Sequence, residues 1–423
     1  MEEYKESGID WIGKIPKNWD IQPLGVCFDE RREKVSDTLF EPLSVTKKGI
    51  LKQLDNVAKS DAHDDRKKVC KDDFVINSRS DRKQSCGLSD YDGSVSLINT
   101  VLISNKKMLE PIFVKFLLDN CMFAEEFYRN GHGIVADLWT TNYTEMKRIY
   151  IPIPSKREQK KIASVLFNKV SKIDKILENL NKQVEILNNF KKSIITEAVT
   201  KGLDINVEYK NSGIDWIGNI PKKWQIKRLK YLGTSRNGLT YSPENIVDED
   251  NGILVLRSSN IQSGKLDYHD NVYVNCKVPV NLLLKKNDLL ICSRNGSRNL
   301  IGKNALIDNS SIGNTFGAFM CVFRGEYNKY IYYIMNSYLF DNYLNSFLTS
   351  TINQLTNSNL GNIKVPFTYD IIEQQKIISY LDDKCSNIDK TIQIKKNQID
   401  KLENYKKSLI YEYVTGKKRV KEE

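Results

Sequence analysis

Histidine is scarce and cysteine pairs are absent in this chain. The 423 residues include only three histidines, and none lies at metal-ligand spacing from a cysteine. The eight cysteines form no Cys-x-x-Cys pair and fall mostly within apolar stretches. These absences argue against a zinc site and a disulfide scaffold, so we expect buried, reduced thiols. Because there is also no apolar run of membrane-spanning length and no secretory signal pattern, the sequence predicts a cytoplasmic protein without a membrane segment.

Signatures of catalysis are missing as well. A glycine pattern at residues 131–136 resembles a dinucleotide-binding loop, but it follows a helix-like segment where that loop needs a strand. Residues 296–303 resemble a phosphate-binding loop, yet one residue too many separates the glycines, and Asn304 stands where Ser or Thr would bind magnesium. The Asn/Asp-Pro-Pro-Tyr motif with which amino-methylating enzymes hold a flipped base is also absent. We therefore expect no covalent chemistry, no metal and no cofactor in this chain.

Positive charge is in excess. Lys and Arg number 64 against 53 Asp and Glu, which gives a formal net charge of +11 and a pI near 9.0. This balance favours an anionic partner, and nucleic acid is the first candidate. An alternative stays open, because Lys-rich and Asn-rich chains from AT-rich genomes are often basic without binding nucleic acid.

An internal repeat is the strongest positive signal. Residues 4–19 read Tyr-Lys-Glu-Ser-Gly-Ile-Asp-Trp-Ile-Gly-Lys-Ile-Pro-Lys-Asn-Trp, and residues 209–224 repeat them almost unchanged. A repeat of this length indicates two copies of one structural unit. Since such a chain behaves like a covalent dimer, we expect a ligand with two matching halves.

Each copy ends in a long segment with helical spacing. Residues 156–200 contain no Gly or Pro, and apolar residues recur there in alternating steps of four and three, which is typical of a coiled-coil seam. The first seam comprises Leu166, Val170, Ile173, Leu177, Leu180, Val184 and Leu187. The second comprises Leu381, Cys385, Ile388, Ile392, Lys395, Ile399 and Leu402, with Lys395 replacing the counterpart of Leu180. Both seams then take the same irregular step, to Phe190, Ile194 and Ala198 and to Tyr405, Leu409 and Tyr413.

These two helices are long enough to act as spacers. About 44 residues correspond to roughly 65 Å of helix. An apolar stripe of that length needs a partner, and the nearest candidate is the other copy. We expect the helices to pack antiparallel, because a closed pseudo-symmetric molecule usually has a twofold axis. The alternative is two unrelated surface helices, each packed on its own domain.

The remaining parts, about residues 20–150 and 225–363, are typical of mixed α/β domains, which we call heads. Residues 73–76, 95–98 and 253–256 indicate strands, and residues 112–128 and 330–347 indicate amphipathic helices. The heads align at residues 71–79 and 286–294 and in little else. Matching ends with divergent heads predict one task performed on two different targets.

Loops after the expected strands are rich in forked donors and amides. In the second head the candidates are Arg257, Ser258, Ser259, Asn260, Arg294, Asn295, Ser297, Arg298 and Asn299. In the first head they are Thr46, Lys47, Lys48, Ser78, Arg79, Arg82, Lys83 and Gln84. Arg can bind guanine bidentately and Asn or Gln can bind adenine, whereas Lys, Ser and Thr mostly contact phosphates. We predict that these loops bind DNA, although each residue taken singly is also typical of a solvated turn.

Several motifs together resemble the specificity subunit of type I restriction-modification systems. They are the doubled Ser-Gly-Ile-Asp-Trp-Ile-Gly segment, the proline-containing entries at residues 151–154 and 365–366, the helix starts at 158–162 and 373–377, and the Lys-Lys-Ser helix ends. The resemblance implies an α+β fold with two α/β target-recognition domains, at residues 1–153 and 204–366. Helical spacers at residues 154–203 and 367–423 would pack as an antiparallel coiled coil in an internal pseudo-twofold repeat.

The same resemblance implies a function. Each target-recognition domain would read one half of a bipartite sequence in double-stranded DNA, while the spacers set the gap and dock two methyltransferase subunits. S-adenosylmethionine, ATP and Mg would belong to those partners and to restriction subunits that can join, so the chain itself would be a non-catalytic DNA-binding subunit. Departures are confined to the second copy, where Phe367-Thr368-Tyr369 replaces the usual proline and Lys395 interrupts the seam.

Two other classes of function fit the repeat without the resemblance. A coiled-coil adaptor would hold two protein ligands and ignore DNA. A single-chain repressor would bind an operator with no partner protein at all.

Overall fold

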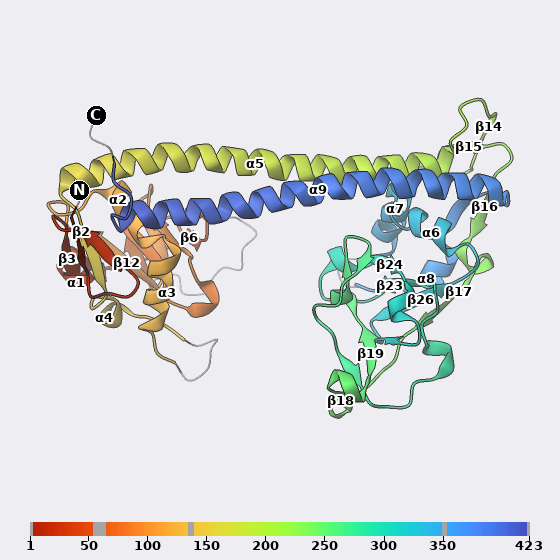
Figure 1. The fold of residues 1–423 in the computed structure, drawn as a ribbon, viewed down its shortest axis with the longest axis horizontal. Helices are drawn as coiled ribbons and strands as arrows, with labels where there is room; N and C mark the ends of the chain where they lie inside the picture. The colour runs from red at the N-terminus through yellow and green to blue at the C-terminus, as the bar shows by residue number, and fades with distance from the viewer. Residues whose placement is uncertain (1–2, 54–64, 134–138, 349–352, 421–423) are drawn as a thin grey trace. The chain divides into compact units, whose positions relative to one another are not determined.

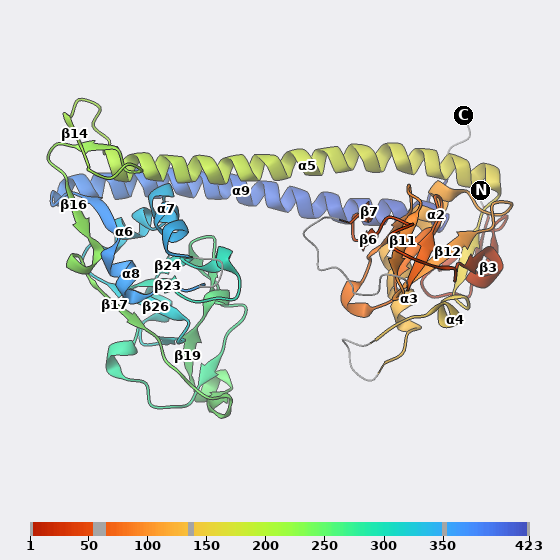
Figure 2. The same ribbon diagram turned by 180° about the vertical axis from the view of Figure 1, so that it is seen from behind.

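The computed structural model describes residues 3–53, 65–133, 139–348 and 353–420. The chain divides into two compact units. Unit 1 comprises Met1–Asn181 and Lys396–Glu423, and unit 2 comprises Lys182–Lys395. Unit 1 is therefore built from both ends of the chain, whereas unit 2 is one continuous segment. Figures 1 and 2 show the elements of each unit from opposite sides.

Two long helices contribute to both units. Helix α5 spans Lys156–Lys201 and α9 spans Ile371–Val414, so the helices expected from the sequence are present. Their 46 and 44 residues correspond to about 69 and 66 Å of helix. Each is followed by a glycine in the left-handed region, Gly202 (φ 73°) and Gly416 (φ 75°), a common way to end a helix.

Within unit 2, segments of α5 and α9 lie side by side. Lys191 Nζ on α5 lies 2.7 Å from Asp389 Oδ1 on α9. Lys395, which interrupts the predicted seam, donates a hydrogen bond to Gln183 of α5. Residue numbers rise along α5 as they fall along α9, so the two segments run in opposite directions in this unit.

Within unit 1, the other segments of the two helices make contacts of the same kind. Asp174 Oδ1 on α5 accepts a hydrogen bond from Lys406 Nζ on α9 at 2.6 Å. Lys169 Nζ donates to the hydroxyl of Tyr413 at 3.4 Å. Here too the helices run in opposite directions.

The predicted seam positions are buried or half-buried, and so are four of the six positions of the irregular step, Ile194, Ala198, Leu409 and Tyr413. Leu166, Val170, Ile173, Leu381, Cys385, Ile388 and Ile392 are buried, and Leu177, Leu180, Val184, Leu187, Lys395, Ile399 and Leu402 are half-buried. Phe190 and Tyr405 instead are 54% and 51% exposed. The next residues, Lys191 and Lys406, face the other helix in their place. The aliphatic part of a lysine can lie along a seam while its ammonium group reaches a carboxylate at the edge.

The globular part of unit 1 contains short strands and short helices. The strands are β1 (Tyr4–Glu6), β2 (Lys14–Pro16), β3 (Asp20–Pro23), β4 (Phe28–Glu30), β5 (Lys34–Val35), β6 (Leu43–Thr46), β7 (Gly49–Lys52), β8 (Arg66–Val69), β9 (Phe74–Asn77), β10 (Cys86–Leu88), β11 (Gly93–Ser96), β12 (Asn99–Ser104) and β13 (Tyr150–Ile153). The helices are α1 (Leu24–Cys27), α2 (Pro111–Leu118), α3 (Cys121–Arg129) and α4 (Tyr143–Met146). The start of α5 and the end of α9 complete the hydrophobic core of this unit.

Unit 2 has a comparable set of elements. The strands are β14 (Tyr209–Asn211), β15 (Asn219–Pro221), β16 (Gln225–Arg228), β17 (Thr234–Asn237), β18 (Ile246–Val247), β19 (Ile253–Leu256), β20 (Ile261–Gln262), β21 (Lys265–Leu266), β22 (Tyr273–Val274), β23 (Leu289–Cys292), β24 (Asn304–Leu306), β25 (Thr315–Phe316), β26 (Met320–Arg324) and β27 (Lys364–Phe367). The helices are α6 (Asn328–Ile334), α7 (Tyr338–Phe347) and α8 (Asn357–Asn362). The end of α5 and the start of α9 pack into its core.

Each unit contains its own four-stranded antiparallel sheet, and the two sheets correspond. The strand order is β10-β9-β12-β4 in unit 1 and β24-β23-β26-β17 in unit 2. The central strands β9 and β23 come from the two aligned sequence segments. The second sheets differ, with order β11-β8-β5 in unit 1 and β18-β22-β19-β25 in unit 2. The units therefore agree in the sheet whose central strand comes from the aligned segment, and they differ in the second sheet.

A turn with a buried aspartate precedes β9 and β23. Asp73 and Asp288 are both buried, and the residue before each has a positive φ, 71° at Asp72 and 63° at Asn287. The carboxylate of Asp73 binds Arg31 Nε at 2.7 Å, and that of Asp288 binds Arg324 Nε at 2.8 Å. Each carboxylate also accepts a backbone N–H at 2.8 Å, which closes the turn.

Both predicted amphipathic helices are interrupted. The segment at residues 112–128 forms α2 and α3, and the carboxamide oxygen of Asn120 caps α3 by accepting from Phe123 N at 2.9 Å. The segment at residues 330–347 forms α6 and α7, separated at buried Ser337, whose hydroxyl donates to the carbonyl oxygen of Ile334. The strand expected at 95–98 ends at Ser96, whereas the strand expected at 253–256 is present as β19.

The repeated segment forms the same small structure twice. Strands β1 and β2 pair in one copy and β14 and β15 in the other, with corresponding registers. Its last tryptophan is fully buried in both copies and binds the third residue of the following long helix. Trp19 Nε1 donates to Glu158 Oε2 at 3.0 Å, and Trp224 Nε1 donates to Glu373 Oε1 at 2.9 Å. We call the repeated segment, residues 4–19 and 209–224, the socket, because it binds the start of the following long helix.

All eight cysteines are free thiols. Cys27, Cys86, Cys292, Cys321 and Cys385 are buried, and the other three are half-buried. Burial raises the pKa of Cys27, Cys292 and Cys385 to about 11. The expectation of buried, reduced thiols therefore holds for five of the eight.

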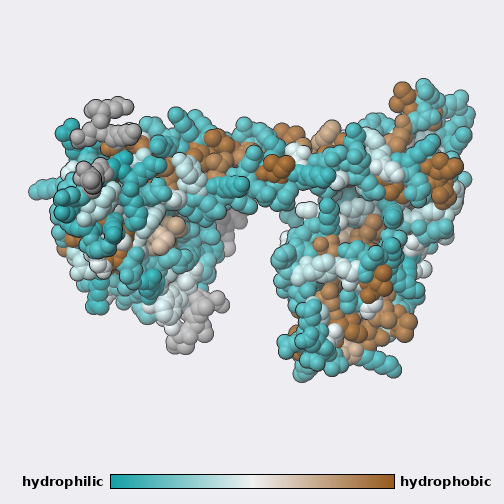
Figure 3. Space-filling view, in the orientation of Figure 1, coloured by the Kyte–Doolittle hydropathy of each residue, from teal (hydrophilic) through white to brown (hydrophobic). Residues whose placement is uncertain are grey.

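The surface in the view of Figure 3 is mainly hydrophilic, with smaller apolar patches. Phe167, Ile186 and Phe190 of α5 and Ile394 of α9 are among the large exposed apolar side chains. Among the described residues, no helix combines the length and the apolar character needed to cross a bilayer.

Candidate nucleic-acid interface

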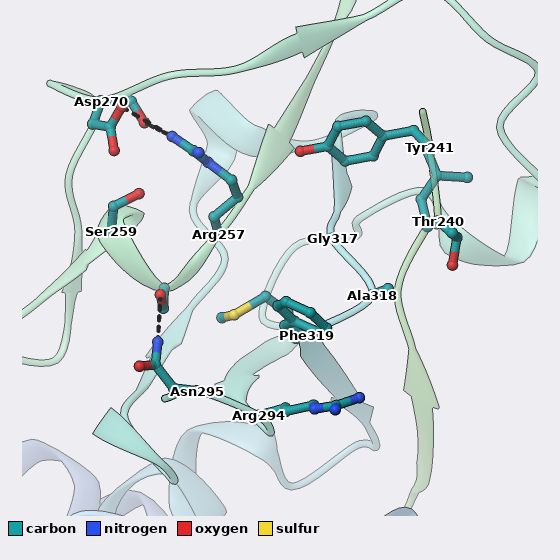
Figure 4. Close-up of a pocket in the computed structure, with 13 residues that line it drawn as sticks. Thr240, Tyr241, Arg257, Ser259, Asp270, Arg294, Asn295, Gly317, Ala318 and Phe319 are labelled. Atoms are coloured by element: carbon teal, nitrogen blue, oxygen red, sulfur yellow. Dashed lines mark hydrogen bonds and ion pairs between the residues drawn. The ribbon is translucent and has the colours of Figure 1, made fainter. Parts of the chain in front are cut away.

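Five loops of unit 2 converge on one pocket of about 530 Å³. Four of them follow β17, β19, β23 and β25, whose ends the two sheets bring together, and the fifth, which contributes Asp270, precedes β22. Figure 4 shows the labelled side chains of these loops around the pocket. Of the residues predicted from the sequence, Arg257, Ser258, Ser259, Arg294 and Asn295 line it. Two predicted loops that are well separated in the sequence therefore form one site.

Arg294 is the most available cation in this site. Its guanidinium carbon lies 5.3 Å from the centre of the Phe319 ring, and its backbone N–H donates to the Phe319 carbonyl at 3.0 Å. Arg294 is exposed and pairs with no carboxylate among the residues that the structure describes. The ring limits where the guanidinium can point while leaving its donors open, which is the arrangement needed to bind an external acceptor.

Arg257 is held more firmly. Its Nη2 lies 2.9 Å from Asp270 Oδ1 and 3.2 Å from the Asp270 carbonyl. Arg257 Nε and the hydroxyl of Ser259 are buried without a hydrogen-bond partner among the described residues. Unpaired polar atoms at the edge of a pocket are suited to a polar ligand, because leaving them unbonded costs about 1 to 3 kcal/mol each.

Asn260 does not belong to the binding surface. It is fully buried, and its carboxamide oxygen accepts from Arg257 N at 2.9 Å. Its Nδ2 donates to the carbonyl oxygens of Asp267 and Asp270 and to Asn271 Oδ1. With donors and acceptor occupied, Asn260 fixes the loop after β19, and we remove it from the predicted DNA contacts.

The other candidates of this head surround the pocket. Asn295 Nδ2 donates to the Ser258 hydroxyl at 3.2 Å and so ties the two loops together. Ser297, Arg298 and Asn299 are exposed but do not line the pocket. They extend the polar surface beyond it, which fits contacts to a backbone better than contacts to a base edge.

Arg79 occupies the same position in unit 1 that Arg294 occupies in unit 2. Both follow a matching central strand, and each forms an isolated antiparallel bridge, Arg79 with Thr140 and Arg294 with Gln354. The surroundings differ, because Arg79 Nε lies 3.3 Å from Asp81 Oδ1. The main chain therefore repeats, while the charge presented to a ligand does not.

The remaining cations of that loop are also paired. Arg82 Nε lies 3.7 Å from Asp81 Oδ2, and Lys83 Nζ lies 2.5 Å from Glu125 Oε1. Gln84 is half-buried and has a positive φ of 62°. Arg82 and Lys83 can therefore reach DNA only by exchanging their carboxylate partner for a phosphate or a base.

The other first-head candidates fall in two places. Lys47 and Lys48 are exposed at the tip of the β6–β7 hairpin, whose turn is closed by the Thr46 hydroxyl donating to the Gly49 carbonyl at 2.9 Å. Ser78 is buried and lines a separate pocket of about 500 Å³. No other predicted residue lines that pocket.

Sequence reasoning missed several side chains that form these sites. In unit 2 they are Thr240, Tyr241, Asp270 and Phe319, and in unit 1 they are Arg32, Lys34 and Lys67. Phe319 is 61% exposed, which is unusual for a phenylalanine, but the sequence alone does not reveal exposure. Lys34 and Lys67 lie within strands, whereas Arg32 lies in the short loop after β4, a strand that was not among those expected from the sequence.

Comparisons with known proteins agree on one family. The family model described as the type I restriction modification DNA specificity domain matches residues 66–186 and 221–404. The type I restriction enzyme MjaVIII specificity subunit of Methanocaldococcus jannaschii is 30% identical over 287 residues, which cover 65% of this chain and 63% of that protein. The putative MjaX specificity subunit of the same organism is 26% identical over 459 residues, covering 100% of this chain and 99% of that protein.

A solved structure agrees in fold. A chain from a structure of a type I restriction-modification system aligns with a TM-score of 0.66 over 95% of this chain and 98% of that one, at 14% identity. At that identity the likeness shows the fold alone. The family model, in contrast, matches more than half of the sequence and does so twice, once in each head. The chain therefore belongs to the type I restriction-modification specificity subunits, the family that carries the DNA sequence specificity of these systems.

Proposed function

We propose that this chain selects the target of a type I restriction-modification complex by reading a bipartite DNA sequence, one half-site with each head. The observation that carries the proposal is the site in unit 2 where Arg294 lies over Phe319 and no described residue gives it a carboxylate partner. A guanidinium with open donors can bind guanine O6 and N7 together in the major groove. Ser258, Ser259 and Asn295 beside it would contact neighbouring bases and phosphates.

Residues 1–153 and 204–366 would be the target-recognition domains, and residues 154–203 and 367–423 the spacers. The spacers would pack as an antiparallel coiled coil related by a pseudo-twofold axis. Two ion pairs support this arrangement, Lys191 with Asp389 and Lys406 with Asp174. Each residue of one pair lies 215 positions from its counterpart in the other, with the two helices exchanged. A twofold repeat accounts for that correspondence.

Two methyltransferase subunits, and through them restriction subunits, would bind this chain in the cytoplasm. Exposed apolar side chains on the long helices, such as Ile186 and Ile394, are suitable parts of such docking surfaces. S-adenosylmethionine, ATP and Mg would be bound by the partners. This chain would contribute recognition and positioning and no bond-making step.

A map of modified bases in cells with and without this chain tests the function. We expect one split motif to lose its methylation when the chain is removed, and the two conserved parts of that motif are the half-sites. An unchanged map would contradict the proposal. Restoring the chain from a plasmid is the matched control.

Binding to duplex DNA separates the proposal from its alternatives. We expect tight, sequence-dependent binding only when methyltransferase subunits are present, with affinity falling steeply as salt rises. An adaptor would bind no DNA under either condition. A single-chain repressor would bind its operator without any partner.

A further inference from the structure

The end of α9 brings an arginine onto the repeated socket of unit 1. Arg419, three residues after Gly416, places Nη2 at 2.9 Å from Glu158 Oε1 and Nη1 at 3.5 Å from Asn18 Oδ1. Glu158 is the residue that also accepts the hydrogen bond from Trp19. The chain's own tail therefore supplies the cation for this glutamate.

Unit 2 repeats the socket without the cation. Glu373 accepts the hydrogen bond from Trp224, and Gly202 ends α5 beside both residues. The third residue after Gly202 is Ile205, which is 88% exposed. Among the described residues, no Lys or Arg forms an ion pair with Glu373. The same carboxylate is thus occupied in one unit and open in the other.

A pocket of about 810 Å³ lies over this open carboxylate. Its wall carries four carboxylates, those of Asp204, Glu208, Asp370 and Glu373, against three lysines, of which Lys222 is already paired with Glu208 at 2.7 Å. Exposed apolar residues, including Ile372, border it. In unit 1, Val420 beside the arginine packs on the core. The pocket therefore suits a cation with an apolar neighbour.

We propose that this pocket binds an arginine side chain of a partner protein, with its guanidinium on Glu373 as Arg419 lies on Glu158. The pocket differs from its counterpart in unit 1 at two positions. Lys223 replaces the counterpart of Asn18, and Asp370 replaces the counterpart of a serine. Lys223 repels a cation on its own side of the pocket and so favours partners that approach from the opposite side. Binding here does not depend on DNA reading, because no residue of this pocket belongs to the loops around Arg294.

The test uses a capped peptide with the sequence of residues 415–420, Thr-Gly-Lys-Lys-Arg-Val, added to the full chain. Its matched control carries citrulline in place of arginine, which keeps the shape and removes the charge. Binding is measured by tryptophan fluorescence and by two-dimensional NMR. We expect a dissociation constant on the order of 0.1 to 1 mM, since a short peptide loses much entropy on association. The citrulline peptide should bind at least about tenfold more weakly than the arginine peptide.

Three variants locate the site. Glu373→Gln keeps an oxygen that can accept from Trp224, so it should fold normally by circular dichroism, yet it should lose the preference for arginine over citrulline. Glu158→Gln should leave that preference unchanged. Lys223→Asn, which restores the residue found in unit 1, should tighten binding several-fold.

The proposal is overturned if the two peptides bind equally, if no binding is detected at 10-fold above the expected range, or if Glu158→Gln removes the arginine preference while Glu373→Gln does not. None of these outcomes bears on the map of modified bases. Failure at this pocket and failure of the proposed DNA function are therefore distinguishable.

Discussion

At the scale of single residues, the two units keep the same buried aspartate but hold it with different arginines. Arg31 lies just after β4, whereas Arg324 lies in β26. The turn before the central strand is thus retained while the support on its far side changes. Since that turn fixes where Ser78-Arg79 and Ser293-Arg294 leave the sheet, we infer that the aspartate holds the candidate DNA-binding loops in place.

Replacing Asp288 by Asn should destabilise unit 2. The substitution keeps the shape but leaves the partly buried guanidinium of Arg324 without its charge partner, at a cost of about 3 kcal/mol. Thermal unfolding followed by circular dichroism measures the effect. Asp400→Asn, at an exposed position of α9, is the control. Equal melting temperatures for the two variants would contradict a structural role for Asp288.

Replacing Arg294 by Ala should relax one base position in one half-site. If the guanidinium binds a base edge, the variant loses about 1 to 3 kcal/mol of discrimination at that position and little elsewhere. Competition binding with half-site libraries, in the presence of methyltransferase subunits, measures this. Arg298→Ala serves as the comparison, because Arg298 lies outside the pocket and should weaken all sequences alike. Uniform weakening by Arg294→Ala would instead make it a phosphate contact.

Single residues also mark where sequence reasoning reaches its limit. Arg294 could be predicted, because a strand pattern followed by polar residues places it at a sheet end. Asn260 has the same signature but folds inward, since backbone carbonyls of residues 267 and 270 approach it. Phe319 could not be predicted, because its exposure depends on how the loop after β25 meets the loop after β23. Contacts between distant loops carry this information, and the sequence pattern does not.

At the scale of elements, periodicity predicted the long helices well and the short ones poorly. An uninterrupted pattern without Gly or Pro identified α5 and α9. The pairs α2–α3 and α6–α7 were each expected as one helix, because apolar spacing continues across Asn120 and Ser337 even though these side chains cap or close the backbone there. The prediction that Phe190 and Tyr405 lie in the seam was wrong for a related reason. The sequence pattern favours the more hydrophobic aromatic side chain, but the adjacent lysines, Lys191 and Lys406, form ion pairs with the facing helix.

The spacers should act as a ruler. Four extra residues in each helix, after residue 184 in α5 and after residue 395 in α9, add about 6 Å and slightly more than one turn. We expect the unread gap in the target to grow by one to two base pairs, at about 3.4 Å each, with both half-sites unchanged. Sequencing of methylated sites reads the result. An insertion in α5 alone is the control, since it should misalign the seam and reduce binding. A change in a half-site with an unchanged gap would refute the ruler.

At the scale of the whole molecule, unit 1 depends on the last turns of the chain. Leu409, Tyr413 and Val414 of α9 are buried in its core, beside Trp19 and Leu166. Unit 2, in contrast, contains no residue beyond Lys395. The two units therefore share a plan but differ in how much of the chain each requires.

A chain ending at Lys395 should keep unit 2 and lose a stable unit 1. Three buried apolar side chains would be missing from unit 1, a loss on the order of 5 kcal/mol. Limited proteolysis with mass spectrometry should show rapid cleavage in residues 20–150 and protection in residues 225–345. A chain ending at Gly416 is the control, because it keeps all of α9 and removes only the contacts of Lys417, Lys418, Arg419 and Val420. Equal protection of both heads in the shorter chain would show that unit 1 is independent of α9.

The construction of unit 1 from both termini also sets an order during synthesis. Its head is translated before unit 2, but the turns of α9 that cover its core are translated after unit 2. At roughly 5 to 20 residues per second, the head waits on the order of 10 to 40 s after α5 is complete. During that interval Trp19 and its neighbours lack part of their cover, whereas unit 2 is complete once Lys395 has been made. A product that stops between Lys395 and Leu409 would therefore contain all of unit 2 and a unit 1 whose core is only partly covered.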